Sequence, residues 1–115
     1  MQTFSLGKVT VPAAGTRVNL GTVLPANFPA DHKAARIIVS QVSGTTGVTV
    51  FGTSAVVAST RVGGIKEFQP PASTGLKDTY IHEDGTAKGN PLHVDDYALD
   101  VATNGEGLIV SVGVR

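Results

Sequence analysis

The most regular alternation of hydrophobic and polar positions lies at the C-terminal end of the sequence. Hydrophobic side chains occupy every second position of residues 108–114, which is the period of a β-strand with one buried face. Residues 97–101 have the composition of another strand, and Asn104-Gly105 between them tolerates the positive φ of a tight turn. The pattern therefore predicts a β-hairpin over residues 97–115.

The opposite face of the last predicted strand carries Ile109, Ser111 and Gly113. These side chains are small or apolar, and they lack the charge that usually protects an exposed sheet. We expect a neighbouring copy or another sheet to cover this face.

A second hairpin is predicted over residues 36–51. Residues 37–39 are a β-branched run with hydrophobic side chains in both phases, which favours a central strand covered on both faces. Small residues at 43–47 predict a turn, and residues 48–51 predict the returning strand.

The N-terminal third alternates as well, with one slip of phase. Phe4 and Leu6 are hydrophobic in one phase and the valines that follow are in the other, so the slip at Gly7-Lys8 predicts a β-bulge. A turn is expected at 12–15, a strand at 16–20 and a loop at 21–33.

Residues 72–91 interrupt the strand pattern and hold a large share of the charge. They read as a loop insertion in which Tyr80 and Ile81 form a short strand. Together the segments predict one domain over residues 1–115. Its fold class is all-β, an antiparallel β-sandwich with a jelly-roll-like arrangement of roughly six to eight strands.

Composition narrows the classes of function. The chain has 115 residues, of which 41% are hydrophobic and only 16% are charged, with nine basic and nine acidic residues in balance. Without a basic cluster we expect no nucleic-acid partner. The low charge is typical of a surface covered by partners. The sequence shows no cysteine, no signal-peptide pattern and no apolar run of membrane-spanning length, so synthesis in the cytoplasm and no membrane partner are expected.

Residues that could carry chemistry do not form a familiar pattern. The histidines (His32, His82, His93) match no ligand spacing, so solvated loop positions are expected and no metal is predicted. Asp95-Asp96 would point to opposite faces of a strand, which favours a strand-entry role over acid–base chemistry. Residues 84–90 resemble neither a phosphate loop nor a calcium loop in full. No catalytic residue, no cofactor and no enzymatic activity are predicted.

Aromatic residues are the best candidates for protein contacts. Phe51 is expected in the core. The N-terminal segment and the loops at 21–33 and 72–91 are expected to carry intermolecular contacts, because loops and termini are where a rigid sandwich displays function. The candidate contact residues are Phe4, Phe28, Phe68, Tyr80 and His82.

The order of these segments carries a resemblance that covers most of the chain. Residues 9–20 are followed by Arg36-Ile-Ile-Val-Ser-Gln-Val42, then Gly47-Val-Thr-Val-Phe-Gly-Thr-Ser54, Gly63-Gly-Ile65 and the terminal strands. This order resembles small β-sandwich proteins of bacteriophage virions, most of all capsid decoration or cement proteins. The segment at 72–91 departs from the simplest version of that pattern.

The resemblance implies a non-enzymatic structural protein on the capsid surface of a virion. It would bind the major capsid protein as a homo-oligomer, with a trimer favoured, and stabilise the contacts between capsid subunits. Two alternatives stay open at this point. One is a tail, connector or fibre-base protein of a virion, and the other is a module that binds a host surface or carbohydrate.

Overall fold

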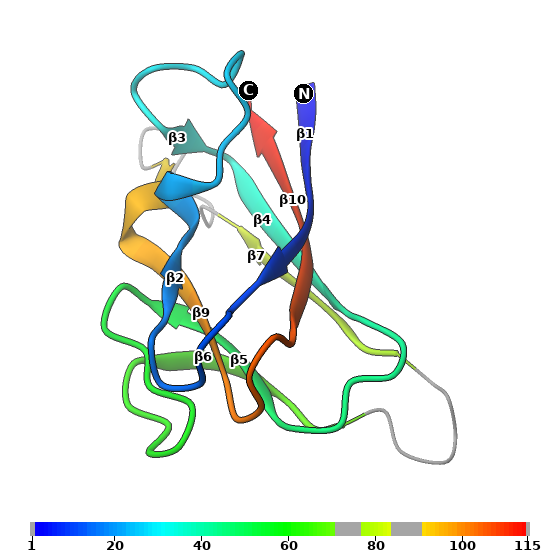
Figure 1. Ribbon diagram of the computed structural model, residues 1–115. Coiled ribbons are helices and arrows are strands. Elements are labelled where there is room, and N and C mark those ends of the chain that lie inside the picture. Colours follow the sequence, from blue (N-terminus) through cyan, green and yellow to red (C-terminus); the bar gives the residue numbers. More distant parts are fainter. Residues whose placement is uncertain (1, 71–76, 84–90, 115) are drawn as a thin grey trace.

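The computed structural model describes residues 2–70, 77–83 and 91–114, and they form an all-β antiparallel sandwich (Figure 1). The predicted all-β class and antiparallel sandwich are confirmed, whereas the expected number of six to eight strands is not. The first sheet has the order β1-β10-β4-β7, with β1 (Gln2–Thr10), β10 (Gly107–Val114), β4 (Arg36–Gln41) and β7 (Thr79–Glu83). The second sheet has the order β2-β9-β5-β6, with β2 (Val18–Asn19), β9 (Tyr97–Val101), β5 (Thr49–Thr53) and β6 (Gly64–Phe68).

Short elements close one end of the sandwich. β3 (Lys33–Ala34) pairs with β8 (Leu92–His93), and two 3-10 turns, η1 (Leu20–Thr22) and η2 (Val94–Asp96), lead into or out of the second sheet. The described residues thus contain ten strands, eight of them in the two larger sheets. No helix among these residues is long and apolar enough to cross a membrane.

Neither predicted hairpin exists. β9 belongs to the second sheet and β10 to the first, and the same is true of β5 and β4. The turn before β10 is instead held by Val11, which follows β1 directly. Val11 N–H donates to the carbonyl of Glu106, and Gly105 N–H donates to the carbonyl of Val11, both at 2.9 Å. The two predicted pairs of strands therefore lie in opposite sheets, whereas β5 and β6 are consecutive strands that do pair side by side.

The core lies between the two sheets. The predicted stripe on β10 is confirmed, since Leu108, Val110 and Val112 are all buried, while Val114 is only half-buried. Across the core, Phe51 and Leu99 have no exposed surface. Each fully buried side chain of this size contributes about 1.5–3 kcal/mol.

β1 confirms the predicted bulge. Its register with β10 shifts between Ser5 and Gly7, and Gly7 has a φ of +66°. Further along the same pair, a Cβ on Gly107 would lie 1.9 Å from the carbonyl oxygen of Val9. Only glycine lets the two backbones come this close.

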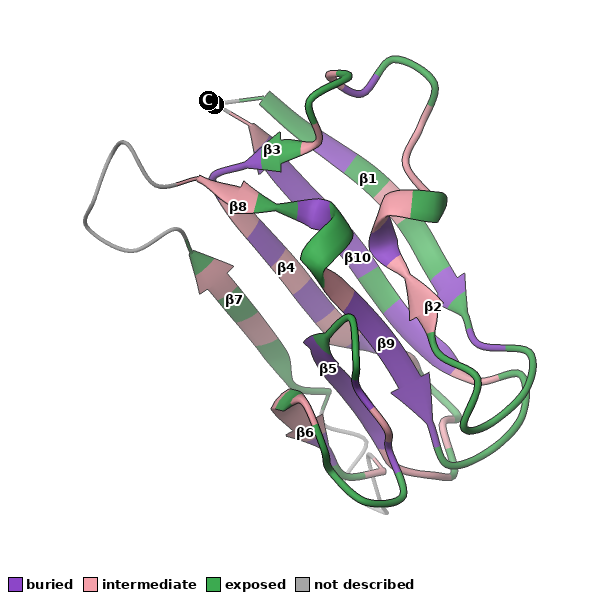
Figure 2. Ribbon diagram, turned by 90° about the vertical axis from the view of Figure 1, so that its left-hand side faces the viewer, coloured by how far each residue is buried: buried purple, intermediate pink, exposed green. Residues whose placement is uncertain are grey.

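The β4 and β7 strands correct two further expectations. β4 is central, but only Ile37 and Val39 of its hydrophobic run are buried, whereas Ile38 is half-exposed (Figure 2). The short strand at Tyr80 and Ile81 is confirmed as β7. It is an integral strand of the first sheet, so the expected insertion over residues 72–91 is not simply a loop. Residues 71–76 and 84–90 of this region lie outside the described residues.

Asp100 is a fully buried carboxylate that joins two loops to β9. Its Oδ1 accepts a hydrogen bond from Gly15 N–H at 3.0 Å and its Oδ2 accepts one from Ala58 N–H at 2.8 Å. Both loops therefore cover the outer face of β9, which explains why Asp100 is buried on a side of the sheet that usually faces water.

Substitution of Asp100 should destabilise the fold. Asp100→Ala leaves two N–H groups without an acceptor, at a cost of about 1–3 kcal/mol for a buried group. Asp100→Asn keeps one acceptor oxygen and should cost less. Urea unfolding monitored by circular dichroism measures both, with exposed Asp31→Ala as the control expected within about 0.5 kcal/mol of the wild type. Equal midpoints for Asp100→Ala and the wild type would contradict this role.

Candidate functional site

Both tyrosines of the chain meet His82 between the two sheets. His82 and Tyr80 lie two residues apart on β7 and so share its inner face, and Tyr97 begins β9 in the opposite sheet. The His82 Nε2 atom lies 3.2 Å from the Tyr97 hydroxyl, and its Nδ1 atom lies 3.3 Å from the Tyr80 hydroxyl. In the neutral imidazole one nitrogen donates to a hydroxyl and the other accepts from one.

Phe51 completes this aromatic cluster from β5. Its ring stacks on Tyr97 with centroids 5.7 Å apart and an interplanar angle of 12°. It meets His82 edge-on at 5.8 Å. Such pairs add about 0.5–1.5 kcal/mol beyond the area they bury. The cluster, defined as Phe51, Tyr80, His82 and Tyr97, therefore fastens the edge strand β7 to the second sheet.

Partial burial sets the protonation of the cluster. Desolvation lowers the pKa of His82 below its ordinary value of 6.5. Desolvation also raises the pKa of Tyr97, with smaller contributions from the charge of Asp96 and from Tyr80. The lowered pKa favours the neutral imidazole, which can donate to one tyrosine hydroxyl and accept from the other.

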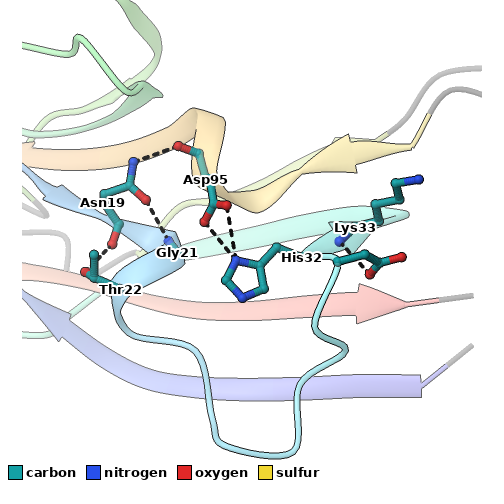
Figure 3. Close-up of polar contacts among 7 residues, drawn as sticks. Asn19, Gly21, Thr22, His32, Lys33 and Asp95 are labelled. Carbon is teal, nitrogen blue, oxygen red and sulfur yellow. Dashed lines mark hydrogen bonds and ion pairs between the residues drawn. The ribbon is translucent and has the colours of Figure 1, made fainter.

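A second polar cluster joins η1, η2 and the end of the loop before β3 (Figure 3). Asn19 accepts a hydrogen bond from Gly21 N–H at 2.8 Å and donates one to the backbone carbonyl of Asp95 at 2.7 Å. The Asp95 carboxylate lies 2.9 Å from His32 Nδ1. His32 has a φ of +54°, a left-handed conformation that non-glycine residues adopt infrequently.

The His32–Asp95 pair resembles a catalytic dyad in geometry, but its surroundings favour a role in holding the loop in place. A dyad of this kind acts through a nucleophile bonded to the other imidazole nitrogen. Among the described residues, His32 makes side-chain hydrogen bonds only through Nδ1, to Asp95, and no hydroxyl is bonded to its Nε2. The backbone carbonyl of His32 also accepts from Val94 N–H at 2.9 Å. The geometry favours anchoring of the loop over chemistry.

The outer face of the first sheet is the third surface of interest. Ile81 is 48% exposed and Ile109 is 43% exposed. The register places Ile81 beside Ile38, which is beside Ser111. This face is therefore apolar or uncharged at Ile81, Ile38 and Ser111, whereas Lys8 lies opposite Ile109. No sheet of the described residues covers Ile109, so coverage of this face by a neighbouring copy stays a prediction.

The structure sorts the predicted contact residues into two groups. Phe4, Phe28 and Phe68 are 6%, 8% and 1% exposed, so these rings are core residues and not surface anchors. Phe4 and Phe28 pack edge to face with centroids 4.9 Å apart, which explains why a loop phenylalanine is buried. Tyr80 and His82 remain half-exposed, and both belong to the aromatic cluster.

The three histidines were expected at solvated loop positions, and not all of them lie there. His32 lies in a loop and His93 is exposed on the short strand β8, but His82 lies within a strand and faces inward. Asp95 and Asp96 form a turn that enters β9, as predicted. Within the described ranges no group of three or more metal-binding side chains converges.

The pKa of His82 predicts a pH dependence of stability. Because the folded pKa is lower than the unfolded one, the unfolded chain binds the proton first as the pH falls. Stability should decrease from above pH 6.5 down to the folded pKa and then level off. Urea unfolding across this range should show a weaker decrease for His82→Gln, while exposed His93→Gln keeps the wild-type profile. Identical profiles for His82→Gln and the wild type would contradict the assignment.

Comparison with known proteins gives no relative, since no family model, no curated protein and no solved structure matches the chain. Its function is therefore inferred from the arrangement of the described residues.

Proposed function

We propose that the sandwich is a jelly roll and that the protein is a structural component of a bacteriophage virion that binds the outer surface of the assembled capsid. The strand order is the observation that supports this most. β1, β10, β4 and β7 form one sheet and β2, β9, β5 and β6 form the other. This order suits two interlocked Greek keys, an architecture common among viral capsid domains.

The proposed mechanism is stabilisation by binding. A protein that binds only the assembled lattice shifts the assembly equilibrium toward the lattice. The free energy of this stabilisation grows with the logarithm of the ratio between the free protein concentration and Kd. A rigid sandwich that spans two capsid subunits would resist their separation. No bond is made or broken, and no catalytic residue is required.

The end of the sandwich near the N-terminus is the proposed contact surface. There the start of β1 and the loop at 23–32 lie at one end of the molecule (Figure 1). Phe4 and Phe28 tie the two segments together from beneath. Ala26 and Asn27 at the loop are exposed. This end combines a rigid base with an accessible, nearly uncharged tip, which suits a protein partner.

Capsid binding tests the proposal. Wild-type protein should co-sediment with capsids assembled without it and raise the temperature at which they disrupt. Ala26→Arg should weaken association by tenfold or more, because it buries a charge at the contact. Exposed Ala13→Arg, in the turn at the other end of the sandwich, is the matched control and should bind like the wild type. Failure of the wild-type protein to bind or stabilise capsids would rule the proposal out.

A second candidate is a carbohydrate-binding module, which the aromatic cluster favours. Tyr80, His82 and Tyr97 are scattered in sequence yet gathered in the structure, and each is half-exposed. Aromatic rings with hydroxyl groups are suited to sugars, and lectins also use jelly rolls. Glycan-array binding that disappears in Tyr80→Ser would favour this candidate over capsid binding.

A further inference from the structure

We infer that β7 is a self-association edge, at which two copies of the chain pair their first sheets into one continuous sheet around a two-fold axis at Ile81. β7 is the outermost strand of its sheet (Figure 2), and β4 is its only strand partner in the described residues. An uncovered edge offers backbone groups that another strand can bind. The inference concerns the isolated protein and does not depend on capsid binding.

The pairing with β4 shows which backbone groups of β7 face away from the sheet. Gln41 N–H donates to the carbonyl oxygen of Asp78 at 3.0 Å, at the end of the β4–β7 register. Residues opposite each other in an antiparallel pair alternate between hydrogen-bonded and non-hydrogen-bonded positions. Tyr80 and His82 therefore bond toward β4, as Asp78 does.

The N–H and C=O groups of Thr79, Ile81 and Glu83 consequently point to the open edge. A two-fold axis at Ile81 places Ile81 opposite Ile81 of the second copy and Thr79 opposite Glu83 of the second copy. Both kinds of pair are then hydrogen-bonded pairs. Every outward N–H and C=O group of the three residues finds a partner in this register.

The two edges of the first sheet differ in how they are protected. β1 carries a bulge, Gly7 with a positive φ, and Lys8. A bulge and a lysine are common devices against edge pairing. β7 has the sequence Thr-Tyr-Ile-His-Glu, and its register with β4 has no shift. β7 is therefore the more regular edge, and no strand of the described residues pairs with its outer side.

The side chains of β7 suit a second copy of the same strand. On the outer face, the half-exposed Ile81 of each copy would lie beside the other and cover apolar surface that the monomer leaves in water. On the inner face, Tyr80 of one copy would lie beside His82 of the other. Glu83 would lie beside Thr79, so no like charges oppose each other within the span of β7. A dimer results, in place of the trimer that the virion resemblance implies.

Two lysine substitutions separate edge pairing from other modes of association. Sedimentation equilibrium of the wild-type protein should give a mass about twice the 11.8 kDa of one chain. Ile81→Lys should halve that mass, because the axis brings two lysines together. Ile109→Lys is the matched control: it is similarly exposed on the same face but lies on the central strand β10, and it should remain dimeric.

Disulfide trapping tests the same contact without requiring a disruptive change. The chain has no cysteine, so Ile81→Cys introduces a single thiol per copy. Hydrogen-bonded residues opposite each other lie about 5.5 Å apart between Cα atoms, within the range of a disulfide. Oxidation should trap Ile81→Cys as a covalent dimer and leave Ile109→Cys largely uncrosslinked. A monomeric or trimeric wild type, loss of the dimer in Ile109→Lys, or equal trapping of both cysteine variants would overturn the inference.

Discussion

The two larger sheets depend on one constraint: the inner face of each sheet is apolar, and the other sheet covers it. Ile37 and Val110 from one sheet and Phe51 and Leu99 from the other have no exposed surface. A two-stranded hairpin of this chain could not bury its apolar stripe alone. The chain satisfies the constraint by crossing from sheet to sheet, and the covering loops are then tied to the outer side of β9 through Asp100.

The sequence predicted which side chains are buried better than it predicted which strands pair. Alternation identified the stripe on β10 and the bulge near Gly7, because side-chain direction and phase are local properties. It did not distinguish a hairpin from a crossing between sheets. The Gly-containing turn before β10 serves either connection, and the choice depends on distant residues such as Val11, which binds the turn.

The candidate sites were also predictable only where they depend on local features of the sequence. Tyr80 and His82 were identified as contact candidates, and their spacing of two residues places them on one face of a strand. Tyr97 and Phe51 join them only through the packing of the two sheets. Phe28 was misjudged because loop position does not imply exposure, and Phe68 was misjudged because it lies in β6 rather than in a loop. The ends of a sandwich are open, and rings from adjoining segments fill them.

The position of β10 between β1 and β4 also governs when the protein can fold. β1 is synthesised before the other described strands, yet β10, the last of them, is its only strand partner in the described sheets. Loop-closure entropy must be overcome before such distant segments bind, which slows folding, and β1 cannot pair until β10 has been synthesised. Until then the apolar stripes of β1 and β4 are exposed together on a nascent chain. That interval, rather than the native state, is when the protein is most exposed to aggregation and to chaperones.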